Sequence, residues 1–227
     1  MIVVVLLIAL GLLMFAPQWW VRHVMRKYGD DIAEMPGTGG ELAEHLIERF
    51  QLSGITVEET EEFGDHFDPK DRKVRLSPSN YQGRSLKAVA VAAHEVGHAI
   101  QFHRQEAVFR LRSRYLPLAE QMRRLGVAVL WLSPLLGLVM KSPLAFMLPI
   151  LISVGMQVIA ALTYLIVLPE EWDASFGKAM PILAEGYVPE SWLPHAETVL
   201  KAAAFTYFAA ALSSVLNLGY LLLLLRR

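Results

Sequence analysis

The stretch Ala88-Val89-Ala90-Val91-Ala92-Ala93-His94-Glu95-Val96-Gly97-His98-Ala99-Ile100 sets two histidines and a glutamate in a run of small and apolar residues. Its length and composition predict one buried helix. Residues four apart on a helix share a face, so both imidazoles can reach a single Zn²⁺, with Glu95 beside them as a general base. Buried ionisable groups need partners that offset their desolvation. This H-E-x-x-H pattern indicates a zinc hydrolase; the alternative is a chance match whose histidines bond to the backbone.

Apolar stretches elsewhere in the chain, which is 54% hydrophobic, predict an integral membrane protein. They cover residues 2–20, 125–140, 144–168 and 202–225. The first lacks the basic residues that begin a cleaved signal peptide, so we interpret it as a retained anchor. Lys141-Ser142-Pro143 forms the turn between the second, which is short for a span, and the third. The chain has no cysteine, which excludes disulfides and thiolate ligands.

The distribution of basic residues predicts the orientation in the membrane. Of the 21 Lys and Arg, 16 lie in residues 21–124, several of them next to the first two apolar stretches. The positive-inside rule then places this segment and the H-E-x-x-H motif in the cytoplasm, with both chain ends outside; Arg226 and Arg227 disagree mildly. The segment also holds 16 Asp and Glu, so its charge balance gives no indication of nucleic-acid binding.

The segment before the motif reads as a small α/β region. Residues 41–50 have apolar side chains at helical spacing after a break at Thr38-Gly39-Gly40. Residues 55–59 and 73–77 alternate like short strands, with turn residues at 68–71. We expect a strand to run beside the motif helix, and an exposed sheet edge to be able to pair with an extended substrate.

A third zinc ligand is expected after the hairpin. Gln101 and Arg104 stand where a metzincin extension needs Gly and His. The segment 169–180 instead begins with Pro169, Glu170 and Glu171, a typical helix start. Two membrane crossings return this segment to the side of His94, which favours Glu171 as the ligand. The alternative is that its acidic residues only cap a solvated helix.

Several blocks of the chain resemble the YugP-like neutral zinc metallopeptidases of bacterial membranes. The blocks are Asp65-His66-Phe67-Asp68-Pro69, the stretch 88–101 around the motif, and Leu168-Pro169-Glu170-Glu171-Trp172-Asp173-Ala174-Ser175. The resemblance covers nearly the whole chain and implies that Glu171, not Glu170, is the third ligand. The family usually has two arginines after the serine, where Phe176-Gly177 stand here. The HtpX-like membrane proteases are similar at a greater distance.

Three further residues are candidates for roles around the zinc. His66 is either a hydrogen-bond donor to the transition state or a loop histidine anchored to Asp65 or Asp68. Asp173 and Ser175 are expected to hold the imidazole tautomers, since a histidine ligand donates its other N–H to an acceptor.

The fold expected from these observations is mainly α with a small α+β part. It is a zincin-like domain of the gluzincin type, integrated with about four transmembrane helices. We expect an anchor over 1–20, a cytoplasmic catalytic segment over 21–124, a transmembrane hairpin over 125–168, a cytoplasmic segment with the third ligand over 169–201, and a C-terminal transmembrane helix over 202–227.

The predicted function is that of a zinc metalloendopeptidase in the bacterial inner membrane, with its active site facing the cytoplasm. It would use His94, His98 and Glu171 as ligands and Glu95 as the base. The resemblance suggests membrane or membrane-proximal proteins as substrates, in quality control. Two alternatives stay open: a catalytically silent scaffold stabilised by zinc, and a protease that cuts next to lipid-modified residues. The sequence leaves protein partners and oligomeric state open.

Overall fold

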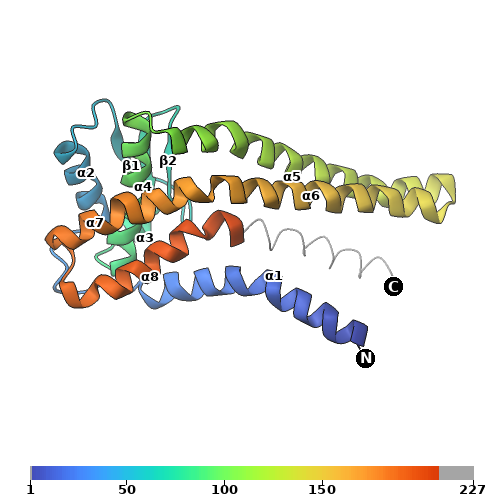
Figure 1. Ribbon diagram of the computed structural model, residues 1–227, viewed down its shortest axis with the longest axis horizontal. Helices are drawn as coiled ribbons and strands as arrows, with labels where there is room; N and C mark the ends of the chain where they lie inside the picture. The colour runs from blue at the N-terminus through green and yellow to red at the C-terminus, as the bar shows by residue number, and fades with distance from the viewer. Residues whose placement is uncertain (1, 210–227) are drawn as a thin grey trace. The chain divides into compact units, whose positions relative to one another are not determined.

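The computed structural model describes residues 2–209, with side chains from residue 15 onward, and is mainly helical with one three-stranded sheet (Figure 1). Contacts divide the chain into two units. The site unit comprises Trp19–Arg110 and Leu168–Thr206. The hairpin unit comprises Leu111–Val167 together with the described residues 2–18 and 207–209. The expected C-terminal span over 202–227 lies outside the described residues from 210 onward.

The elements follow one another in a simple order. They are α1 (Ile2–Lys27), α2 (Gly39–Arg49), β1 (Thr56–Glu59), β2 (His66–Asp68), β3 (Lys73–Leu76), α3 (Pro78–Tyr81), α4 (Leu86–His103), α5 (Ala107–Met140), α6 (Pro143–Trp172), the π-helical turn η1 (Asp173–Ala179), α7 (Met180–Ile182), the π-helical turn η2 (Leu183–Tyr187), the 3₁₀ turn η3 (Glu190–Trp192) and α8 (Leu193–Ala204).

Helix α2 begins at the glycines that were expected to precede it. Thr38 is its N-cap, and the Thr38 and Glu41 side chains each accept a hydrogen bond from the other residue's backbone N–H, a capping box. A Cβ on Gly39 would meet the carbonyl oxygens of Asn80 and Ala88. Glycine at this position therefore allows the first turn of α2 to lie directly against α3 and α4.

The sheet has the order β1-β3-β2, with β1 parallel and β2 antiparallel to the central strand. The strands expected at residues 55–59 and 73–77 are confirmed as β1 and β3. Strand β2 was not predicted, because three residues are too few to show alternation. Phe67 pairs with Val74, and both are buried on the face that packs on α4.

Helix α4 is the buried helix expected from the motif. Ser85 caps it by accepting from the Ala88 backbone N–H at 3.0 Å, and every residue from Ala88 to Gln101 is buried. It packs against α2, the sheet, η1 and α8. The two histidines and the glutamate are thus held in the most enclosed part of the site unit.

The helix that carries Glu171 does not begin at Pro169, as the sequence pattern suggested. Pro169 lies inside α6, which starts at Pro143 and reaches Trp172 before the helix widens into η1. Proline removes one backbone hydrogen bond from a helix, a loss tolerated in long apolar helices where local adjustments satisfy the backbone. Glu171 therefore stands on a continuation of the second hairpin helix.

In the hairpin unit, α5 and α6 run antiparallel around the turn predicted at residues 141–143 (Figure 1). The residues on their facing sides repeat at spacings of four and three residues, as in a coiled coil. These are Gly126, Leu130, Ser133 and Gly137 on α5 and Phe146, Ile150, Ser153 and Gln157 on α6. Gly126 lies against Gln157 and Gly137 against Phe146, so small residues receive larger ones.

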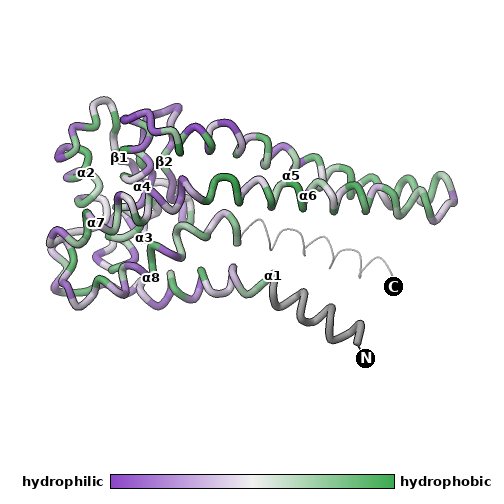
Figure 2. Tube along the Cα trace, viewed as in Figure 1, coloured by the Kyte–Doolittle hydropathy of each residue, from purple (hydrophilic) through white to green (hydrophobic). Residues whose placement is uncertain are grey.

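Two helical runs of the described chain are long and apolar enough to cross a membrane, instead of the four stretches expected. They are Ala107–Met140 and the continuous run Pro143–Tyr187. Figure 2 shows the hydrophobic colouring of the hairpin helices and the polar start of α5. The expected first stretch has described side chains only from residue 15, and most of the fourth lies outside the described residues.

Candidate metal centre

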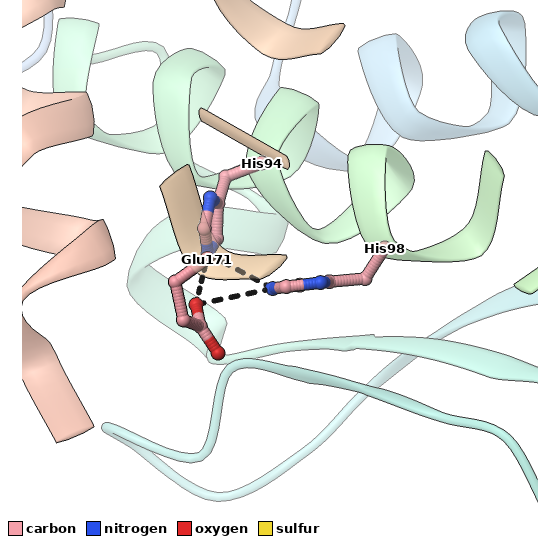
Figure 3. Close-up of side chains that lie close together, drawn as sticks. All are labelled: His94, His98 and Glu171. Atoms are coloured by element: carbon pink, nitrogen blue, oxygen red, sulfur yellow. Dashed lines mark hydrogen bonds and ion pairs between the residues drawn. The ribbon is translucent and has the colours of Figure 1, made fainter. Parts of the chain in front are cut away.

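Three buried side chains of the site unit meet at one point (Figure 3). The Nε2 atoms of His94 and His98 are 3.2 Å apart, and each lies 3.3 Å from Oε2 of Glu171. The two rings project from adjacent turns of α4 with their planes 79° apart. The arrangement is a nearly equilateral triangle of ligand atoms, with side chains exposed by at most 5%.

The other ring nitrogen of His94 is held by Ser175. Its Nδ1 lies 2.9 Å from the Ser175 hydroxyl, which donates its own proton to the Leu200 carbonyl of α8 at 3.1 Å. Because the hydroxyl has only one proton, it accepts from Nδ1–H of His94. A neutral His94 therefore presents an Nε2 lone pair to the triangle.

The other ring nitrogen of His98 faces two acceptors. Nδ1 lies 3.1 Å from Oε1 of Gln101 and 2.6 Å from Oε1 of Glu170. Glu170 is fully buried. Both oxygens attract the proton on Nδ1, so a neutral His98 also presents its Nε2 lone pair to the triangle.

The electrostatics of this point favour a positive charge. Burial lowers the pKa of His98, but the carboxylates of Glu170 and Glu171 outweigh it and hold that pKa well above its usual range. A proton or a metal cation among the two ring nitrogens and the carboxylate oxygen would offset the repulsion between their lone pairs at such short separations.

The residues fit a zinc ion. Zinc binds histidine nitrogens and carboxylate oxygens at about 2.0 to 2.2 Å with tetrahedral angles, which puts neighbouring ligand atoms about 3.3 Å apart. The three separations in the triangle are 3.2, 3.3 and 3.3 Å. Three protein ligands leave one position for water or substrate, the pattern of catalytic zinc sites rather than closed structural ones.

The other residues expected at the site lie in different surroundings. Glu95 is buried on α4 between the two histidines, with 7% exposure. Asp173 contacts neither imidazole directly; its Oδ2 accepts from Nε2 of Gln101 at 2.9 Å. His66 is half-buried on β2, where Nδ1 donates to the Gly64 carbonyl at 2.6 Å rather than to Asp65 or Asp68. It alternates with the inward-facing Phe67, so it lies on the sheet face opposite to α4.

Three contributors to the site were not recognised in the sequence. Glu170 was set aside in favour of Glu171, and Gln101 was used only to exclude a metzincin extension. Gly97 was read as a variable position of the motif. A Cβ on Gly97 would lie 2.7 Å from the Ala174 carbonyl oxygen, so its absence lets η1 approach α4. Gln101 and Gly97 could have been recognised from their position on the helix face that carries the histidines.

Comparisons with known proteins place the chain in a family. Residues 2–226 match the model of a family described as "Putative neutral zinc metallopeptidase". The chain is 36% identical over 213 residues to the "Putative membrane protease YugP" of Bacillus subtilis (strain 168), covering 92% of this chain and 90% of that protein. No solved structure matches the chain significantly.

Proposed function

The chain belongs to the neutral zinc metallopeptidase family, and on this premise we propose that it is a membrane-integrated zinc endopeptidase. The observation that carries the proposal is the triangle of His94, His98 and Glu171 on buried helices, with Glu95 on the same helix as the two histidines. We propose these three residues as the zinc ligands. Peptide bonds of membrane or membrane-proximal proteins are the proposed substrates.

Each residue of the site has its own role in the proposed reaction. A zinc ion held by the three ligands would supply Lewis acidity and lower the pKa of a coordinated water toward about 7. Glu95 accepts a proton from the attacking water and delivers it to the leaving amine, so the peptide nitrogen departs as a neutral group. Ser175 keeps the His94 proton on Nδ1, and Glu170 with Gln101 does the same for His98.

His66 is kept in the proposal as a candidate donor to the developing oxyanion. Its Nδ1 proton is directed to the Gly64 carbonyl, so only the doubly protonated ring can donate through Nε2. Its place on the outer face of the sheet requires that substrate pass along β2, the edge strand next to β3. His66→Phe tests this role: a catalytic donor predicts a lower kcat, whereas an anchoring role predicts a lower melting temperature with unchanged kcat.

We propose a cytoplasmic location for the site, with the hairpin as a pair of membrane crossings. The basic residues next to the first two apolar stretches and the proposed ligand pairing of His94 with Glu171 across the hairpin support this topology. The chain has no cysteine, so Ser142→Cys gives a single label at the hairpin turn. Labelling from the outside is expected; labelling only from the cytoplasm would contradict the two crossings.

The function is tested with the purified full-length protein, unfolded casein and a lipid-anchored peptide, each with and without a chelator. Hydrolysis that the chelator abolishes and zinc restores is expected. Glu95→Gln keeps the side-chain shape but removes the base, so activity falls by about 10²- to 10⁴-fold while zinc remains bound.

Glu185→Gln, which alters a surface pair with Arg49, is the control. Unchanged activity of Glu95→Gln would contradict the mechanism, and wild-type protein that binds zinc but cuts neither substrate would favour the scaffold.

A further inference from the structure

The two histidines of the site are held by chemically different partners. His94 donates from Nδ1 to the neutral hydroxyl of Ser175. His98 directs Nδ1 to an amide oxygen of Gln101, and Oε1 of the buried Glu170 carboxylate lies 2.6 Å from the same nitrogen, as an ion pair rather than a hydrogen bond. A carboxylate behind an imidazole makes the opposite ring nitrogen more basic and hence a stronger metal ligand. The asymmetry therefore bears on how strongly each histidine binds a metal.

Gln101 has all of its visible hydrogen-bonding capacity committed. Its Nε2 donates to the backbone carbonyl of Glu170 at 3.0 Å and to Oδ2 of Asp173 at 2.9 Å. Neither acceptor can donate in return, so the amide orientation is fixed with Oε1 toward His98. The side chain is fully buried. Gln101 thus connects His98 to the helix that carries both glutamates.

Asp173 also pairs with Lys178, through the same Oδ2 that accepts from Gln101. Lys178 lies 2.8 Å from Oδ2 of Asp173 and 3.1 Å from Oε2 of Glu106, with only 15% of its own side chain exposed. A Cβ on Gly177 would collide with the carboxylate of Asp173. Glycine at 177 therefore leaves room for Asp173 in the conformation that reaches Lys178 and Gln101.

We propose that Gln101 and Glu170 together position His98, and that Asp173, paired with Lys178, holds Gln101 in place. The proposal rests on the metal site of the proposed function and adds a division of labour between adjacent glutamates. Glu171 contacts the metal, and Glu170 acts on it through His98. The polar connection runs from Lys178 through Asp173 and Gln101 to Nδ1 of His98, and Glu170 supplies the negative charge there.

The test measures zinc affinity of the full-length protein in detergent by competition with a chelator, beside the melting temperature of the metal-free protein. Glu170→Gln retains the shape of the side chain and removes its charge. We expect its zinc dissociation constant to rise by about 10- to 100-fold, with little change in the melting temperature. Gln101→Leu, which removes the amide, is expected to weaken zinc binding and to alter the absorption spectrum of the Co²⁺-substituted protein.

The control is Glu185→Gln, which removes a charge from an ion pair on η2 and should leave zinc affinity unchanged. A Glu170→Gln protein with wild-type zinc affinity and an unaltered Co²⁺ spectrum overturns the proposed positioning of His98, whatever its melting temperature. If the wild-type protein itself fails to bind zinc, the proposed function fails instead. Should Gln101→Leu not fold, Glu170→Gln and its spectrum decide the question alone.

Discussion

Several buried polar side chains of the site unit have a different role from two buried serines of the hairpin unit. In the site unit, His94, His98 and Gln101 each have a directed partner, and the contacts orient the two imidazoles toward one point. In the described part of the hairpin unit, the hydroxyls of Ser133 and Ser153 are buried without a hydrogen bond. They occupy the seam beside glycines, where small size lets the helices approach.

Serine therefore has a different role in each unit. Ser175 matters for its proton and lone pairs, since it joins His94 to Leu200. Ser133 matters for its volume, since it lies in the seam between α5 and α6. Removing the hydrogen bonds of Ser175 or Gln101 at nearly constant volume should damage the site unit, whereas removing the hydroxyl of Ser133 or Ser153 should leave the hairpin unit nearly unchanged.

Alanine substitutions of two helical glycines are expected to show the largest difference in stability between the two units. Gly97→Ala would place a Cβ 2.7 Å from the Ala174 carbonyl oxygen, which belongs to the backbone and cannot rotate away. Moving η1 away from α4 is expected to cost about 1 to 3 kcal/mol and to weaken zinc binding, because Glu171 lies three residues before Ala174. The measurements are the melting temperature and the zinc dissociation constant.

Gly155→Ala is the matched variant in the hairpin, where a Cβ would have no neighbour within 4 Å. Its stability is expected to change by less than about 1 kcal/mol, in the stabilising direction, since alanine favours helix. Equal losses of stability in the two variants would show that the close approach at Gly97 is not specific to the site.

Alanine substitutions of Ser175 and Ser133 should give a smaller difference in stability between the two units. Ser175→Ala leaves both Nδ1–H of His94 and the Leu200 carbonyl without this partner, at an expected cost of about 1 to 2 kcal/mol in unfolding free energy. Ser133→Ala removes a hydroxyl that has no hydrogen bond and should change stability by at most about 0.5 kcal/mol. A larger loss for Ser133→Ala would contradict its assignment as a spacer.

Local sequence patterns were enough to predict α2, α4 and the hairpin turn. Helical spacing predicted α2, an apolar run of helical length predicted α4, and turn residues between two apolar stretches predicted the turn. The ligand pair on α4 follows from helical spacing, and Ser175 was expected from the need of a histidine ligand for an acceptor. Glu171 was selected by membrane parity and by family resemblance. The structure brings it within 3.3 Å of both imidazoles.

The remaining features depend on tertiary contacts that no local pattern encodes. Glu170 and Glu171 are adjacent acidic residues, and only the direction of α6 and η1 decides which one faces the triangle and which faces Nδ1 of His98. The continuity of α6 through Pro169 depends on its surroundings rather than on helix propensity. The three-residue strand β2 exists only through pairing with β3.

The zinc content of purified wild-type protein and of the Glu171→Ala variant tests the site most directly. One zinc per chain is expected for the wild type, with a severe loss on Glu171→Ala, because two histidines alone leave the ion with too few protein ligands. Glu190→Ala, a surface carboxylate outside the triangle, serves as the control and should keep its zinc. A Glu171→Ala protein that binds zinc with wild-type stoichiometry and affinity would contradict the proposed metal centre.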